Sequence, residues 1–475
     1  MDTSHRSRSL RDESAGLPRA ESPGKLLGLV EAFVFYGLVA LIGLVAIRYG
    51  TVEPWWEAVF ECAVFILGLL WIIHGLFSGS WIQGNVRVFY PMIALVALAL
   101  VQSLPLWQMD WAGNKVWYAI SADPFESRRF ALKTGALVLA GLMLVRYTDS
   151  RRRLSVLVHT IIGVALATAL FGIARQGMQH APGFGLPRLG QGMGYAQFIN
   201  KNHFAYLMEM ATGLVAGVAI MRSEKRERLL IYLAAFLVMW VALVLTNSRG
   251  GLLAMVAQVV CGSVIVLDSR PRTADAVQSW TRSLAVRAAM IVALLIVVAG
   301  GVVWLGGDQL ATSVETAAIE MAGADQSELH EGARRRDIWR STWLMFKAHP
   351  IAGVGFGGYW AEVPQFHQGS GKLVAQQAHN DYLEVLASGG IVGIGLLGWF
   401  AVVLVRQARR ALTVTDGFQR AVAGGAIIGL VGVAVHSMVE FGLHITLNAL
   451  VFVALVAILG LKAMTSPPRP EEVAG

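Results

Sequence analysis

Charge is scarce in this 475-residue sequence, and that scarcity excludes most classes of soluble protein. Only 15% of the residues are Asp, Glu, Lys or Arg, whereas a soluble globular chain carries about 25%. The hydrophobic fraction is 55% and the mean hydropathy is +0.57. Many apolar runs are near 20 residues long, the length that crosses a bilayer as a helix. The sequence therefore predicts an all-α, polytopic membrane protein.

Cysteine is also nearly absent, and no cleavable leader is recognisable. Cys62 and Cys261 both fall inside apolar runs, so neither a disulfide framework nor a cysteine-based metal site is expected. Residues 1–24 are polar and rich in Arg, and a long apolar segment follows them without a small-residue cleavage site. We expect a disordered cytoplasmic tail that leads into the first membrane span. We find no soluble domain and no internal repeat.

The apolar runs predict twelve spans, which place both termini on the same side of the membrane. Lys and Arg gather in the tail and in the short even-numbered loops, and such loops face the cytoplasm. This distribution accounts for the net charge of +8 without a nucleic-acid partner. The spans are expected at about 26–47, 55–77, 88–107, 130–146, 154–174, 203–221, 229–247, 250–267, 285–305, 390–405, 421–437 and 445–463.

This orientation divides the chain into five parts. A cytoplasmic tail, residues 1–25, precedes spans 1 to 9 in residues 26–305. A large outer loop follows in residues 306–389, then spans 10 to 12 in residues 390–463, and a second cytoplasmic tail in residues 464–475. The 306–389 loop is the longest polar interruption, so we expect the chemistry there.

A shorter outer loop, residues 108–129, is rich in aromatic side chains. It contains Trp111, Trp117 and Tyr118, and Trp107 lies at its edge. Such side chains gather at the level of the lipid headgroups, which is the placement we expect here. Stacking on a sugar ring is the alternative.

The large loop is expected to contain two helices separated by a glycine-rich turn. Asp325-Gln326-Ser327-Glu328 has the pattern of a helix start, and this helix should stop near Lys347, before Pro350. Within it, Arg335, Trp339 and Trp343 share one face at i, i+4 and i+8. Gly353, Gly355, Gly357 and Gly358 predict a flexible turn. A second helix should begin at His379 or Asn380.

The motifs of this region resemble those of the O-antigen ligase and O-antigen polymerase superfamily. They are an Arg four residues before Trp339, then His349-Pro350, the alternating glycines, and His379-Asn380-Asp381-Tyr382-Leu383-Glu384 before a glycine-rich helix start. The resemblance extends to Asn247-Ser248-Arg249-Gly250-Gly251 and to Asn200-Lys201-Asn202-His203-Phe204. It implies a membrane glycosyltransferase with its large outer loop late in the chain.

Two arginines are the candidate ligands for a lipid diphosphate. A cation at the membrane edge, such as Arg249, is costly unless it is paired or faces a polar cavity, and Arg binds phosphate oxygens through two parallel hydrogen bonds. The alternative for Arg249 is an interfacial anchor. The resemblance implies a functional Arg at this motif, and of Arg334, Arg335 and Arg336 only Arg335 has the family's spacing to Trp339.

His379 is the candidate general base. A helix N-terminus and nearby arginines disfavour a protonated imidazole, which leaves a neutral ring able to accept a proton. The alternative is a structural histidine. Asn380 and Glu384 are candidates for orienting His379 or for binding sugar. Tyr382 is a candidate for stacking on sugar, although packing is the simpler interpretation.

Further polar residues lie in spans and outer turns. His436, Glu440 and His444 recur every four residues, a spacing compatible with metal ligands only if the segment stays helical; we favour a polar cavity wall, above all for Glu440. The resemblance makes Asn202 and His203 cavity-lining candidates, with helix capping as the alternative. Glu209 lies within a span and needs a partner.

The resemblance implies transfer of a glycan from undecaprenyl diphosphate with inversion, at the periplasmic face of the bacterial inner membrane. The arginines would hold the diphosphate and His379 would deprotonate the acceptor. No cofactor or metal is expected, and no Asp-x-Asp sequence lies in a predicted outer loop. Acceptors left open are lipid A-core, another lipid-linked repeat unit, and Ser or Thr of a protein. A flippase or transporter for the same lipid is the non-enzymatic alternative.

Overall fold

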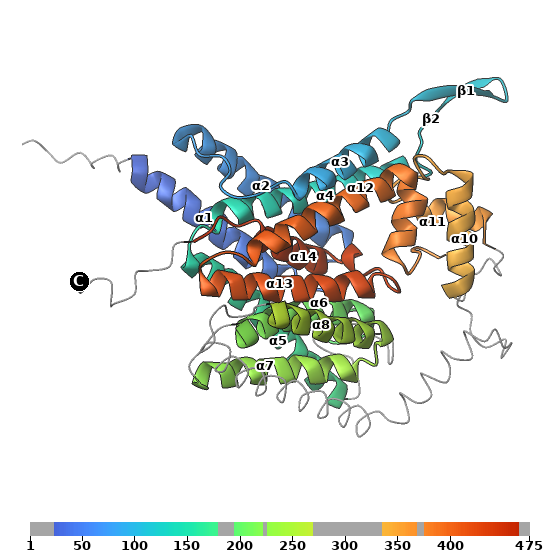
Figure 1. Ribbon diagram of the computed structural model, residues 1–475. Coiled ribbons are helices and arrows are strands. Elements are labelled where there is room, and N and C mark those ends of the chain that lie inside the picture. The colour runs from blue at the N-terminus through green and yellow to red at the C-terminus, as the bar shows by residue number, and fades with distance from the viewer. Residues whose placement is uncertain (1–22, 179–193, 222–225, 269–334, 368–374, 465–475) are drawn as a thin grey trace, which may run out of the picture.

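A computed structural model describes residues 23–178, 194–221, 226–268, 335–367 and 375–464, most of them in helices (Figure 1). The first helices are α1 (Pro23–Leu44), α2 (Pro54–Ser78), α3 (Phe89–Gln102), α4 (Pro124–Tyr147), α5 (Arg151–Gly177), α6 (Lys201–Met221), α7 (Arg226–Leu245) and α8 (Arg249–Asp268). After the residues left undescribed come α10 (Arg335–Ala348), α11 (Tyr359–Glu362), a 3-10 turn η1 (Val363–Gln365), α12 (Asp381–Ala411), α13 (Gly417–His436), a 3-10 turn η2 (Gly442–His444) and α14 (Thr446–Leu459).

The described helices confirm a polytopic helical membrane protein. Nine of them are long and apolar enough to cross a bilayer, and α3 and α14 are shorter apolar helices. Eleven of the twelve expected spans coincide with a helix, and the remaining one, 285–305, lies outside the described residues. The expected start of a loop helix at Asp325 also lies outside them, but α10 ends at Ala348, within one residue of its expected end.

The loop after α3 departs from the expected all-α architecture. Strands β1 (Trp107–Trp111) and β2 (Asn114–Tyr118) pair antiparallel and project from the bundle (Figure 1). Ala112 and Gly113 connect them with φ angles of 52° and 81°. Positive φ at both central residues suits the twist of a two-residue hairpin. The high content of aromatic residues, which favour strands, was the sequence signal for this hairpin.

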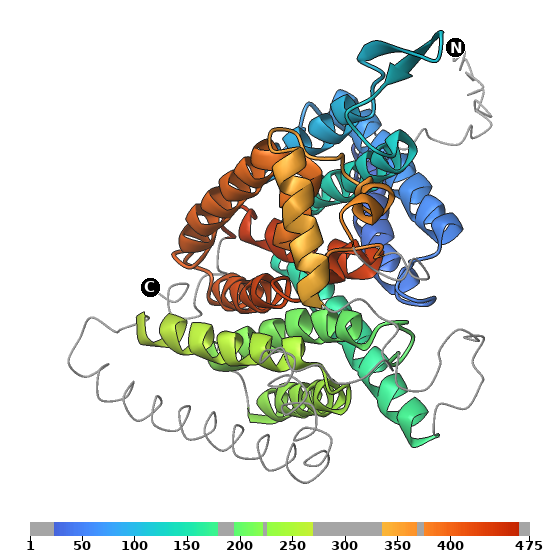
Figure 2. The same ribbon diagram turned by 90° about the vertical axis from the view of Figure 1, so that its right-hand side faces the viewer.

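The core of the bundle is the contact between α6 and α13, which lie side by side in both ribbon views (Figures 1 and 2). Gly213 and Gly217 of α6 face Gly425 and Gly429 of α13, and a Cβ at Gly213 or Gly217 would overlap the backbone of the partner helix. Small residues four apart let membrane helices approach closely. Since α6 begins and α13 ends at the same end of the bundle, this contact fixes the two segments that carry the site.

A cap made of α10, α11 and the glycine turn covers this end of the bundle (Figure 2). The turn is tightly packed, contrary to the flexibility expected of it. Gly353, Gly355 and Gly357 all have positive φ, and a Cβ at Gly353 would overlap the Ser388 backbone. Gln102 at the end of α3 holds the turn: its amide donates to Ala352 O at 2.6 Å and Ser388 O at 2.9 Å and accepts from Phe356 N at 3.1 Å.

Candidate active site

The buried carboxylate of Glu440 is the centre of a polar cluster. α13 ends at His436, and the turn after it carries Glu440, whose side chain is 1% exposed. One oxygen, Oε1, lies 2.8 Å from His379 Nδ1. The other, Oε2, accepts hydrogen bonds from Asn202 and, at 3.1 Å, from Arg335. Three candidate residues from distant parts of the sequence therefore meet at the carboxylate of a fourth.

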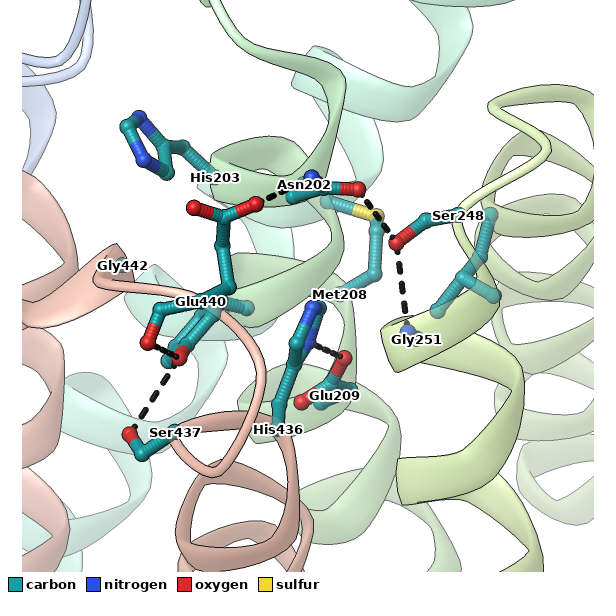
Figure 3. A network of polar contacts seen from close by, with 12 residues as sticks. Asn202, His203, Met208, Glu209, Ser248, Gly251, His436, Ser437, Glu440 and Gly442 are labelled. Carbon is teal, nitrogen blue, oxygen red and sulfur yellow. Dashed lines mark hydrogen bonds and ion pairs between the residues drawn. The ribbon is translucent and has the colours of Figure 1, made fainter. Parts of the chain in front are cut away.

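Asn202 extends the cluster to the start of α8. Its side-chain oxygen accepts from Ser248 Oγ at 2.8 Å, and Ser248 Oγ accepts from Gly251 N at 3.2 Å (Figure 3). Ser248 thus caps α8. Asn247, one residue earlier, has a φ of 51°, a conformation that Asn tolerates better than most residues. The Asn-Ser-Arg-Gly-Gly motif is therefore a helix start that joins α8 to α6.

The backbone around His379 is held from several sides. Asn380 caps α12 by accepting from Tyr382 N and Leu383 N, both at 3.0 Å. Just before His379, Ala378 donates its N–H to Glu384 at 2.9 Å and its carbonyl accepts from Trp339 Nε1 at 3.1 Å. His379 itself has a φ of 49°. Such a conformation is uncommon for residues other than glycine and is held by its surroundings.

The side chain that hydrogen-bonds to the His379 ring is that of Glu440. Asn380 and Glu384 do not contact the ring through a hydrogen bond. Asn380 caps the helix and Glu384 binds the backbone of Ala378, so both act on the backbone beside His379. Their roles in orienting His379 or in binding sugar stay predictions. The expected helix start is correct: α12 begins at Asp381 with Asn380 as its cap. Tyr382 donates to the carbonyl of Ala434 at 2.7 Å, which fits the packing interpretation.

Glu440 remains ionised in its buried position. Burial alone would raise the pKa of its carboxyl group, but the hydrogen bond and charge of His379, with the charge of Arg335, hold the pKa at about 2. When the His379 ring is neutral, an ionised carboxylate favours the tautomer with its proton on Nδ1, in which Nε2 is the nitrogen with a free lone pair. It also stabilises the imidazolium that forms when Nε2 takes a proton.

His203 lies beside the cluster without contacting Glu440 through a hydrogen bond. Its ring packs edge-on against Phe441 at a centroid distance of 4.8 Å, and the ring of His379 packs against the same phenyl at 4.8 Å. Asn448, a residue that sequence reasoning overlooked, donates to the carbonyls of His203 and Gly442 at 2.9 and 3.1 Å. The start of α6 and the turn after α13 are thereby fixed together.

Three cations lie at the first residues of helices that carry parts of this cluster. Arg335 is the first residue of α10, Arg249 the first of α8 and Lys201 the first of α6, and the charges of both arginines act on Lys201. α12 begins two residues after His379. Helix N-termini attract anions through their free N–H groups and dipole. Lys201 is therefore a third candidate cation beside the two arginines. The sequence pointed to it only as one residue of the Asn200–Phe204 motif.

His436, Glu440 and His444 do not form one cluster. The helix ends at His436, so the spacing of four residues no longer places the three side chains on one face. His436 Nδ1 contacts Glu209 Oε1 at 2.7 Å inside the bundle, which supplies the partner that Glu209 needed (Figure 3). His444 lies 3.3 Å from Glu384. Among the described residues, no group of three His, Cys, Asp or Glu side chains is arranged to hold a metal ion.

Comparison with known families agrees with this geometry. Residues 234–398 match the family model described as O-antigen ligase. This region is therefore similar to the O-antigen ligase family. The match confirms the resemblance to the O-antigen ligase and polymerase superfamily that the motifs suggested, and it covers Arg249, Arg335 and His379. Asn202 and Glu440 lie outside the matched residues 234–398 but contact Ser248 and His379 within them. No curated protein matches the chain.

Proposed function

We propose that this protein is an inverting, metal-independent glycosyltransferase that moves a glycan from undecaprenyl diphosphate to an acceptor hydroxyl. The observation that carries the proposal is the contact between His379 and the buried, ionised Glu440, which Arg335 also contacts. The charges of Arg335 and Arg249 both act on Lys201, so the three cations lie near one another. A base and an anion site are the two parts that such a displacement needs.

In the proposed reaction His379 acts as the general base. Its Nε2 takes the proton of the acceptor hydroxyl as the acceptor oxygen forms a bond to the anomeric carbon. Glu440 holds the ring through Nδ1 and stabilises the imidazolium. Because the acceptor attacks opposite the leaving group in a single displacement, the anomeric carbon inverts.

The leaving group is the lipid diphosphate, which departs with the electron pair of the glycosidic bond. Arg249 and Arg335 are its proposed ligands, with Lys201 as a third cation and the N-termini of α6 and α8 as further sources of positive potential. Arg335 donates one hydrogen bond to Glu440, and its side chain is still 49% exposed. It thus connects the base to the proposed diphosphate site.

The acceptor decides which member of the superfamily this is. Lipid A-core would make it a ligase, a second lipid-linked repeat unit a polymerase, and Ser or Thr a protein O-oligosaccharyltransferase. We place the site at the periplasmic face of the bacterial inner membrane because the basic loops assign the opposite face to the cytoplasm. A flippase would need two-sided access to the lipid, whereas the polar cluster joins the turn after α13 to the starts of α6, α8, α10 and α12.

Purified protein tests the function directly. It is incubated with lipid-linked glycan extracted from the producing cells and, separately, with lipid A-core, further donor lipid or Ser/Thr peptides. We expect transfer to one of these acceptors, a product of inverted configuration, and no loss on adding a chelator. Movement of the lipid across vesicles without any transfer would establish the flippase instead.

A further inference from the structure

A cavity separate from the Glu440 cluster lies between the hairpin and the cap. Its volume is about 350 Å³, and its walls include Trp117, Tyr118, Pro124, His349 and Glu362. This volume is at the lower end of the range of roughly 300–1,000 Å³ for small-molecule sites. The cavity is therefore large enough for a small ligand.

The lining of the cavity combines aromatic faces with a polar pair. Trp117 is 60% exposed, and His349 Nε2 lies 3.4 Å from Glu362 Oε1. Glu362 is largely buried, with 15% of its side chain exposed, and its second oxygen accepts from Gln365 Nε2 at 3.0 Å. The C–H face of a pyranose packs on an aromatic ring while its hydroxyls bond to carboxylate and imidazole groups. This lining therefore suits a sugar ring.

The cavity and the Glu440 cluster lie at opposite ends of α10. Arg335 begins the helix, and His349 follows its last residue. Fourteen residues at a rise of about 1.5 Å separate the two ends by about 20 Å. Trp343, which is 48% exposed, lies between them on the helix. A single sugar bound at His379 cannot reach the cavity, but an oligosaccharide laid along α10 reaches it.

The link between the hairpin and the cap holds the cavity in place. Ala122, four residues after β2, donates to Val354 O at 2.9 Å in the glycine turn. Ser127 Oγ donates to Phe356 O at 2.6 Å. The wall carrying Trp117 and the wall carrying His349 are thus fixed relative to each other, as a binding site requires.

We propose that this cavity binds one pyranose unit of the substrate glycan, several sugars away from the bond that forms. The proposal rests on the proposed function, because that function supplies the oligosaccharide. The glycan is either that of the lipid-linked donor or that of the acceptor. In both cases the cavity acts as a length-sensing subsite that raises affinity for long substrates.

Trp117→Ala tests the subsite, with Trp107→Ala as its matched control. Trp107 pairs with Tyr118 and Trp117 with Gln108, so the two tryptophans lie on opposite faces of the hairpin. Only Trp117 lines the cavity. Each variant is assayed with the extracted lipid-linked glycan and with the same lipid trimmed to its first sugar, and the acceptor glycan is trimmed in a parallel series.

We expect Trp117→Ala to raise KM for one full-length glycan by roughly threefold to tenfold, because one aromatic contact is lost. KM for the trimmed form of that glycan should not change. Trp117→Phe should retain most of the affinity, and Trp107→Ala should behave as wild type. The glycan whose trimming removes the effect is the one that the cavity binds. Quenching of tryptophan fluorescence by the free oligosaccharide released from the affected lipid should also be weaker in Trp117→Ala.

Two results would overturn the subsite. One is an equal effect of Trp117→Ala on full-length and trimmed substrates. The other is an equal effect of both tryptophan variants, which would identify the hairpin as a membrane anchor. Either result leaves the proposed function standing, since wild type still transfers glycan. Failure of wild type to transfer from any donor contradicts the function instead, and the fluorescence titration then decides on the subsite alone.

Discussion

At the scale of single residues, the proposed diphosphate site depends on the shape of the arginine side chain as well as its charge. Lys retains the charge but loses the planar fork that pairs with two phosphate oxygens. A hydrogen bond to a charged group contributes about 1.5–3 kcal/mol, so Arg249→Lys and Arg335→Lys should each lower transfer by about tenfold or more. The double Ala variant should lose less than the sum of the single variants, because both act on one group.

The measurement is glycan transfer at matched expression, with Arg151→Lys as the control. Arg151 lies 3.9 Å from Asp416, just before α13, at the other end of that helix from Glu440. It should tolerate Lys. Normal activity in both test Lys variants, with strictly additive Ala losses, would show that Arg249 and Arg335 are interfacial anchors.

Glu440 makes the stability of the site dependent on pH. Its folded pKa of about 2 lies below the ordinary value of 4.5, so its stabilising contribution is complete above about pH 4.5 and is lost as the pH falls through about 2. A shift of this size corresponds to roughly 3 kcal/mol. In detergent, Glu440→Gln should therefore unfold at a lower temperature than wild type at pH 6. This gap in unfolding temperature should close below pH 4. A gap that stays constant with pH would show that the carboxylate charge contributes nothing.

At the scale of elements, the close approach of α8 to α13 places Arg249. A Cβ at Gly250 would overlap the His436 ring, whereas at Gly262, further along α8, it would make an ordinary contact of 3.4 Å with Ile428 Cδ1. Gly250→Ala should push the start of α8 away and lower both transfer and the unfolding temperature. Gly262→Ala should leave both unchanged. If the two variants have the same transfer rate and the same unfolding temperature, the close approach of α8 to α13 at Gly250 is not needed to place Arg249.

The helices were predictable from sequence because each is a local apolar run, and their ends follow local signals. Asn380 as the cap of α12 and Pro350 after α10 are such signals. The β-hairpin was not predicted because its two five-residue strands are short and of mixed polarity. Hydropathy, which located the membrane spans, does not distinguish such strands from the rest of an outer loop. Glu440 was predicted as a residue of the cavity wall, but not as the hydrogen-bond partner of His379. Glu440 is 61 residues away, and its turn reaches the start of α12 through tertiary contacts, such as the hydrogen bond from Asp381 N to Ser437 O at 2.9 Å.

Lys201, Gln102 and Asn448 were beyond sequence reasoning for the same physical reason. Gln102 and Asn448 bind backbone carbonyls that lie 250 and 245 residues away in the sequence. Lys201 is marked by the charges of Arg249 and Arg335, which belong to other helices. A single Gln at the end of an apolar helix carries no sign that it will hold a glycine turn 250 residues later. The motif residues Arg249, Arg335 and His379 were found because the family resemblance marked them, and their roles stay predictions until activity is measured.

At the scale of the whole molecule, the orientation in the membrane decides which side the site faces. The basic loops predict both termini inside and residues 306–389 outside. A reporter enzyme active only in the periplasm should be active when fused after Ser370 and silent when fused after Ser223. The opposite pattern would move the Glu440 cluster to the cytoplasmic side and remove the periplasmic assignment.

The proposed reaction depends most directly on His379 as the base that Glu440 holds. The measurement is the rate of glycan transfer by His379→Ala, with and without added imidazole, beside wild type and the control His159→Ala on α5. Loss of a general base typically costs about 10²–10⁴-fold. We predict a loss of that size in His379→Ala with normal folding, partial recovery with imidazole, and no change in His159→Ala. Transfer by His379→Ala within a few-fold of wild type would contradict the account and make His379 a structural residue.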